Sequence, residues 1–129
     1  MNKILVEISA GELLDKISIL EIKREKIKDI EKLKFINNEL SILQDQFRKN
    51  IKSDDKLDSL YQLLKKVNSK LWVIEDNKRQ CEKDKSFTEN FIKLSRDIHF
   101  LNDDRANIKL DINNYTGSII KEIKEYTKY

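Results

Sequence analysis

Two arginines fall on positions where the helical pattern of the sequence predicts apolar side chains. Between residues 86 and 114, apolar residues recur at alternating steps of three and four, which is typical of a helix packed along other helices. Arg105 fills a missing position of this series, and Arg24 fills one in an earlier series. An unpaired charge in a core is very costly, so each guanidinium requires an acidic partner; Glu21 and Glu75 lie beside the same stripes. The pattern therefore predicts a polar cluster inside a helical core.

Further polar residues share the flanks of these stripes, since a helix turns by about 100° per residue. The complete predicted cluster is Glu21, Arg24, Asn68, Trp72, Glu75, Arg79, Asn102, Arg105 and Lys109. Cations outnumber carboxylates in it, which suits an anionic, phosphate-bearing small ligand held by Arg24, Arg105 and Lys109. The two glutamates would orient these cations, and Trp72 would stack on a ring of the ligand. The alternative is a closed salt-bridge network that only fixes the packing of the helices.

Acidic pairs leave an enzymatic alternative open. All-α nucleotide pyrophosphohydrolases hold Mg²⁺ around a phosphate chain with paired acidic residues on helices, and this chain offers Glu12/Asp15, Glu21/Glu25, Glu75/Asp76 and Asp103/Asp104. Such pairs are more often a solvated helix face, and neither His99 nor Cys81 lies in a recognisable catalytic arrangement. We therefore expect a non-catalytic binding or assembly module with no cofactor and no metal. The alternative is a Mg²⁺-dependent hydrolase of a nucleotide or phosphorylated metabolite.

Composition narrows the class of protein further. The chain has 129 residues, which suggests a single helical domain over residues 1–129, and it has no proline and only two glycines, as long helices require. The net charge of +3 comes from interleaved charges of both signs, whereas a nucleic-acid surface is clustered and basic. One cysteine, no long apolar run and no visible signal peptide predict a cytoplasmic protein that binds neither membranes nor nucleic acid.

The elements that must position the cluster begin with a short extended segment at residues 3–8, rich in β-forming side chains. Ser9 then opens a capping box, which predicts the start of a first helix near residue 10. The apolar series of this helix continues to about residue 48. A phase shift at residues 27–33 predicts a bend or a change of packing partner there, and the pair Asn37–Asn38 is the predicted position of any complete break.

Two further helices are predicted at residues 57–81 and 86–114, and a short fourth helix follows Gly117. The predicted fold class is all-α: an antiparallel bundle of three long helices plus a short C-terminal helix, with coiled-coil-like seams. The first helix would overhang the other two and leave an apolar face uncovered. Because Ile19 and Ile22 lie opposite its main stripe, we expect a homodimer formed through this helix.

Several stretches of the chain resemble a family of small bacterial and phage proteins that is catalogued as a domain of unknown function. They are GELLDKISILEIKREKI (residues 11–27), VNSKLWVIED (residues 67–76) and NDDRANIKLDIN (residues 102–113). The resemblance covers nearly the whole chain and implies no particular activity. The family pattern includes Glu12, Asp15, Lys16, Glu21, Lys23, Trp72, Glu75, Asp76, Arg79, Asn102, Asp103, Arg105 and Lys109, so the resemblance implies a shared site or a shared structural network at these positions.

Overall fold

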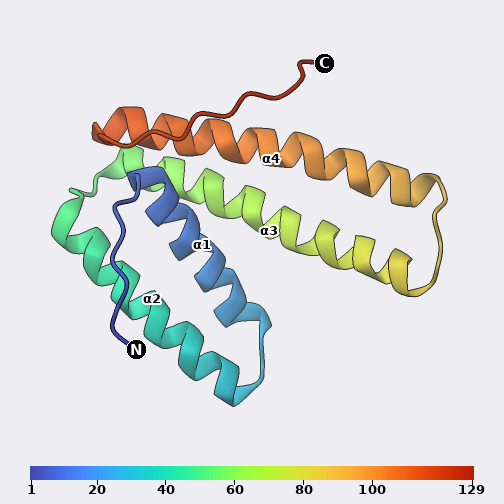
Figure 1. Cartoon of the computed structure of the whole chain (residues 1–129), viewed down its shortest axis with the longest axis horizontal. Helices are drawn as coiled ribbons and strands as arrows, with labels where there is room; N and C mark the ends of the chain where they lie inside the picture. Colours follow the sequence, from blue (N-terminus) through green and yellow to red (C-terminus); the bar gives the residue numbers. More distant parts are fainter.

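The computed structural model describes all 129 residues and contains four α-helices and no β-strand, which confirms the all-α fold class. The helices are α1 (Ala10–Lys26), α2 (Ile30–Asn50), α3 (Asp55–Lys83) and α4 (Glu89–Thr116). They form two helical hairpins, α1–α2 and α3–α4, which diverge from the end where the α2–α3 connection lies (Figure 1). None of the four helices combines the length and the apolar character that crossing a bilayer requires.

The predicted first helix over residues 10–48 is two helices, so that part of the sequence-based interpretation is wrong. The break lies at residues 27–29, within the predicted phase shift, whereas the pair Asn37–Asn38 lies inside α2. Asp29 caps the new helix, because its carboxylate accepts the backbone N–H of Lys32 at 3.1 Å. The chain reverses here, and α2 folds back along α1 instead of extending beyond it (Figure 1).

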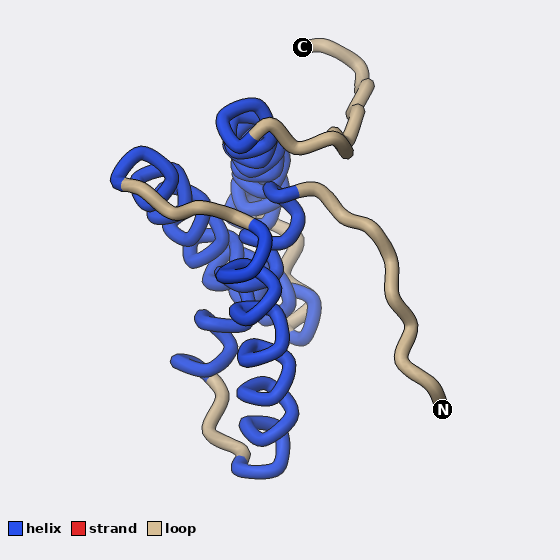
Figure 2. Tube along the Cα trace, turned by 90° about the vertical axis from the view of Figure 1, so that its left-hand side faces the viewer, coloured by secondary structure: helices blue, strands red, loops and turns tan.

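The C-terminal end of the chain also differs from the sequence-based prediction, whereas residues 3–8 form no helix, as expected. Residues 118–129 form no helix, because Gly117 ends α4 in a left-handed conformation with φ +70°. The last residues return along α4, where the Tyr129 ring meets the Phe100 ring at a centroid distance of 5.6 Å. Residues 3–8 pair with nothing and lie apart from the helices (Figure 2).

Helix α1 is the central element, since it packs against α2, α3 and α4, whereas α2 packs on no helix other than α1. The buried core is Leu13, Leu14, Ile17, Leu20, Ile36, Leu40, Leu57, Leu64 and Ile112. No residue between Leu64 and Ile108 belongs to this core. Residues 72–104, which we call the arm, therefore consist of two antiparallel helix segments and their turn, and these segments pack mainly on each other (Figure 1).

The overhang from which a homodimer was predicted does not exist in this fold. The face of α1 opposite its main stripe is covered within one chain, and Ile22 on that face is only 1 % exposed. Ile19 is half-buried beside it. Ile22 therefore offers no free surface to a second chain, and the homodimer itself stays a prediction.

Candidate functional site

A second stripe of α1 carries the buried charge of the molecule. Gly11, Asp15, Ser18 and Ile22 follow one another at steps of four, three and four, and all four are buried. Three of them contact the other helical hairpin: Gly11 and Asp15 bind Asn113 and Arg105 of α4, and Ser18 binds Asn68 of α3. Asp15 is only 1 % exposed, so its carboxylate must find partners inside the protein.

The Asp15 carboxylate is the centre of a hydrogen-bond network. Arg105 donates to both of its oxygens, through Nε at 2.9 Å and through one terminal nitrogen, in the bidentate geometry that suits a guanidinium. Asn68 Nδ2 donates to Asp15 Oδ1 at 2.8 Å and to Ser18 Oγ at 2.7 Å. The hydrogen bonds to Asp15 raise the pKa of the Arg105 guanidinium, although burial acts against this.

This network also fixes the orientation of the Asn68 amide. An ionised carboxylate can only accept hydrogen bonds, so the NH₂ group of Asn68 must face Asp15. The amide oxygen then has no partner in the chain, and no fully buried side-chain polar atom is left unpaired. This oxygen is therefore not fully enclosed, and Asn68 is one of the residues that line a pocket described below.

The predicted acidic partners of the arginines are wrong. Glu21 instead accepts hydrogen bonds from the Tyr61 hydroxyl and from Lys65 Nζ, the latter at 3.1 Å. Burial and the hydrogen bond to Glu21 raise the pKa of Tyr61. Glu75 is exposed and forms no ion pair with Arg105 or any other cation. The sequence thus identified Arg105 as inward-facing and missed the carboxylate that neutralises it.

The prediction for Arg24 is also wrong, since its side chain is exposed and makes no ion pair. Helix α1 ends at Lys26, and Arg24 lies in its last turn with Lys23 and Lys26. Three cations there are placed favourably against the negative end of the helix dipole. The physical reason for the error is the reversal at residues 27–29, which removes the neighbouring helix that a longer rod would have presented to Arg24.

Lys109 belongs to a separate cluster beside Asp15. Its ammonium group lies 2.6 Å from a Glu12 oxygen, 3.2 Å from Glu122 and 3.9 Å from Asp15. Burial alone would raise the pKa of Glu12, but hydrogen bonds with Lys109 and Glu122 lower it to about 2. Lys109 is therefore neutralised by carboxylates of this chain, which removes it from the group of cations expected to hold a ligand.

We expect the free energy of unfolding to decrease as the pH falls from about 4.5 to about 2. The pKa of Glu12 is 4.5 when the group is unperturbed and about 2 in the folded protein, so its contribution to stability is complete above pH 4.5 and is lost as the pH falls through 2. Urea denaturation of the wild type and Glu12→Gln at successive pH values measures this contribution. The two proteins should differ most near neutral pH and converge toward pH 2; a constant difference would contradict the assignment.

A pocket of about 390 Å³ opens where α3 and α4 leave α1. It is lined by Ile19, Ile22, Asn68, Leu71, Trp72, Glu75, Asp76, Arg79, Asn102 and Arg105. The structure therefore brings together six of the nine residues of the predicted cluster. Those that lie elsewhere are Glu21, Arg24 and Lys109.

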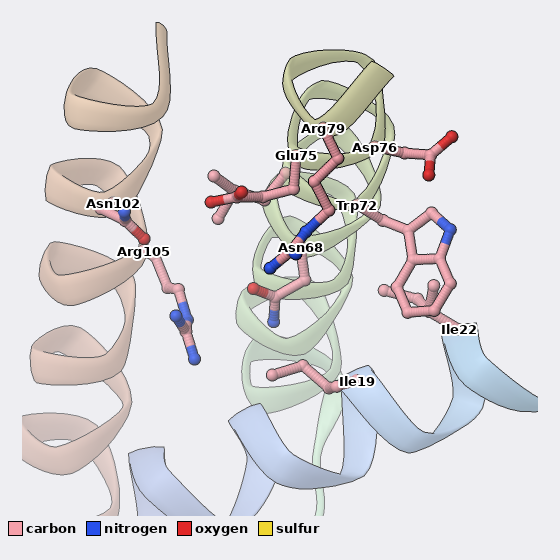
Figure 3. Close-up of a pocket in the computed structure, with 10 residues that line it drawn as sticks. Ile19, Ile22, Asn68, Trp72, Glu75, Asp76, Arg79, Asn102 and Arg105 are labelled. Atoms are coloured by element: carbon pink, nitrogen blue, oxygen red, sulfur yellow. The ribbon is translucent and has the colours of Figure 1, made fainter. Parts of the chain in front are cut away.

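The pocket combines cationic hydrogen-bond donors with an apolar wall. Arg79 forms no ion pair, and its side chain runs from α3 into the space between Glu75 and Trp72 (Figure 3). Arg105 uses two guanidinium nitrogens on Asp15, and its third nitrogen has no partner in the chain. The indole of Trp72 lies near Ile22, whereas the Asp76 carboxylate points away from Arg79 (Figure 3). The pocket can thus offer guanidinium donors, an aromatic surface and a free carboxylate at Glu75.

The acidic residues considered for Mg²⁺ do not converge. No group of three or more His, Cys, Asp or Glu side chains is arranged to hold a metal ion. Asp15 pairs with Arg105, and Glu12 pairs with Lys109. Glu25 pairs with Lys65 Nζ at 2.9 Å.

Asp15 and Ser18 are the members of the network that sequence reasoning missed. The signal was present in the four-three-four spacing of Gly11, Asp15, Ser18 and Ile22, which marks a second packed stripe. A small residue and a hydroxyl on that stripe allow a neighbouring helix to approach closely. Asp15 was instead grouped with Glu12 as an acidic pair, because their three-residue spacing also matches a metal-binding helix face.

Comparison with known families matches residues 4–129 to the family of unknown function DUF6165. No curated protein and no solved structure matches the chain.

Proposed function

Because the chain belongs to the DUF6165 family, whose description states no activity, we propose its role from the pocket: a non-catalytic module that binds a small anionic ligand. The observation that carries this proposal is the pair of arginines in one pocket. Arg79 has all its donors free and Arg105 has one free terminal nitrogen. Planar guanidinium groups bind phosphate through paired hydrogen bonds, so a phosphate-bearing metabolite is the best chemical fit.

The other walls define the rest of the proposed ligand. A ring or planar group stacks on Trp72, against the apolar side formed by Ile19 and Ile22. Glu75 is an exposed, unpaired carboxylate that can accept a hydrogen bond from a ligand, and the free oxygen of Asn68 can accept another. Hydroxyl and amino groups supply such donors. A volume of about 390 Å³ is in the range that small-molecule sites occupy.

The competing hydrolase hypothesis gains no support from the arrangement of carboxylates, because four of the eight considered for Mg²⁺ bind cations of the chain. We propose a cytoplasmic setting for the binding role. Cys81 is the one cysteine and is free, which suits a reducing compartment.

Substitution of Arg79 tests the proposal. A panel of nucleoside monophosphates, sugar phosphates and inorganic phosphate is screened by thermal shift, and the best compound is measured by titration calorimetry. A ligand at about 100 times its Kd adds about 2.7 kcal/mol of stability and raises Tm by several degrees. Arg79→Gln should weaken binding about 10- to 100-fold, because charged hydrogen bonds contribute about 1.5–3 kcal/mol.

Arg24→Gln is the matched control, since Arg24 is also an exposed, unpaired arginine but lies outside the pocket. It should leave the affinity unchanged. Glu75→Gln removes a negative charge from the same wall and should strengthen binding of inorganic phosphate about fivefold. If no compound in the panel shifts Tm, or if the two arginine variants behave alike, the pocket is not an anion site and the cluster serves packing alone.

A further inference from the structure

Residues 3–8, with the sequence KILVEI, are an extended segment without a partner. No backbone N–H or C=O group of these residues takes part in a hydrogen bond within the chain. The residues Ile4, Leu5 and Val6 are 78 %, 88 % and 75 % exposed. The segment lies apart from the helices and leads directly into the α1 cap at Ser9 (Figure 2). Its backbone and its apolar side chains are therefore both available to another strand.

The composition of the segment suits a β-strand with two different faces. Side chains alternate between faces in a strand, so one face carries Ile4, Val6 and Ile8. The other face carries Lys3, Leu5 and Glu7, an apolar residue between opposite charges. β-branched residues are enriched in strands, and an unpaired apolar strand is a template for pairing with another chain.

We propose that residues 3–7 pair antiparallel with the same residues of a second copy of this chain, with Leu5 opposite Leu5 and Ile8 opposite Asn2. In this register Lys3 of each copy lies opposite Glu7 of the other, and the two-fold symmetry forms this pair twice. Ile4 lies opposite Val6. Opposite charges that face each other across a strand pair are stabilising, and like charges are destabilising. The segment is thus complementary to itself in charge and in apolar pattern.

Other pairings of the segment with itself lose this match. A parallel in-register pair would place Lys3 beside Lys3 and Glu7 beside Glu7. An antiparallel pair shifted by one residue would place Lys3 opposite Ile8 and Glu7 opposite Ile4. The proposed register separates the two Ser9 residues by about 25 Å along the strands, at about 3.3 Å per residue. The two helical bodies therefore begin at opposite ends of the ribbon and do not compete for space.

Charge exchange tests the proposal by sedimentation at concentrations up to about 100 µM, where a micromolar association is populated. The wild type should form a dimer. Lys3→Glu and Glu7→Lys should each weaken it about tenfold or more, because each brings like charges together twice. The double variant should restore it, and so should an equal mixture of the two single variants. These positions lie outside every helix, so circular dichroism should be unchanged in all of them.

Oxidative cross-linking tests the register itself. In a Cys81→Ser background, Leu5→Cys places two thiols opposite each other at a distance that a disulfide can span. Ile8→Cys is the control, because the two copies of this position lie about 20 Å apart in the proposed register. The first variant should become a covalent dimer and the second should not. A wild-type chain that sediments as a monomer at every concentration, or a dimer unaffected by Lys3→Glu, would overturn the proposal. Either result leaves ligand binding at the pocket untouched.

Discussion

Arg105→Met should lower the free energy of unfolding by about 3 kcal/mol. The substitution leaves the Asp15 carboxylate, which is 1 % exposed, without the cation that binds both its oxygens. Removing one member of a buried ion pair costs about 3–5 kcal/mol, because the remaining charge is uncompensated. We expect the lower end, since Arg105 is 31 % exposed and Lys109 lies 3.9 Å from the same carboxylate. Urea denaturation measures the change.

The matched control is Arg96→Met, an exposed arginine on the same helix that forms no ion pair. It should change stability by less than about 0.5 kcal/mol. Adding Asp15→Ala to Arg105→Met completes a double-mutant cycle, and the double variant should be much more stable than the sum of the two single changes predicts. Additive effects would show that the guanidinium and the carboxylate are not coupled in solution.

Gly11→Ala should destabilise the protein by about 3 kcal/mol, although alanine is the better helix former. In an exposed helix this change would gain about 0.8–1 kcal/mol. Here the new Cβ would lie 2.5 Å from the backbone oxygen of Lys109 and 2.9 Å from Asn113 Oδ1. The Gly11 N–H also donates to Asn113 Oδ1 at 2.6 Å, so α1 and α4 cannot separate without losing this bond. A backbone atom cannot rotate aside as a flexible side chain can, so the clash can be relieved only by moving one helix relative to the other.

The chain offers a second glycine as the control. Gly117 has φ +70°, but nothing lies within 4 Å of a Cβ built there. Gly117→Ala should therefore cost only about 1 kcal/mol, the conformational penalty of the left-handed region. Thermal or urea unfolding of both variants distinguishes a steric effect from a backbone effect. If Gly11→Ala is neutral or stabilising, the close approach of α1 to α4 is not as described.

The inward position of Arg105 was predicted correctly because the evidence for it lies within a single helix. A polar residue at a missing position of a regular apolar series lies on the packed face of its helix, whichever helix packs there. The same argument failed for Arg24, because periodicity does not distinguish a continuous helix from two helices joined by a tight reversal. The carboxylate of Asp29 decides between them, because it accepts the backbone N–H of Lys32 and caps the start of α2.

Partner identity was not predictable from spacing alone. Glu21 and Asp15 lie on different sides of α1, and only the positions of α3 and α4 show that Asp15 meets Arg105 whereas Glu21 meets Lys65. The pocket was anticipated through the flank that Trp72 and Arg79 share on α3. The apolar wall of the pocket was not predicted, because Ile19 and Ile22 were expected to be covered by a second copy of the chain.

Ligand binding in the pocket should change how easily the arm opens locally. Segments with few packed neighbours open locally at a lower cost than global unfolding. Arg79 belongs to the arm, whereas Arg105 is anchored through Asp15 to the central helix. A ligand that binds both guanidinium groups would connect the arm to the central helix α1. It would therefore slow amide exchange in parts of the arm that the ligand does not contact.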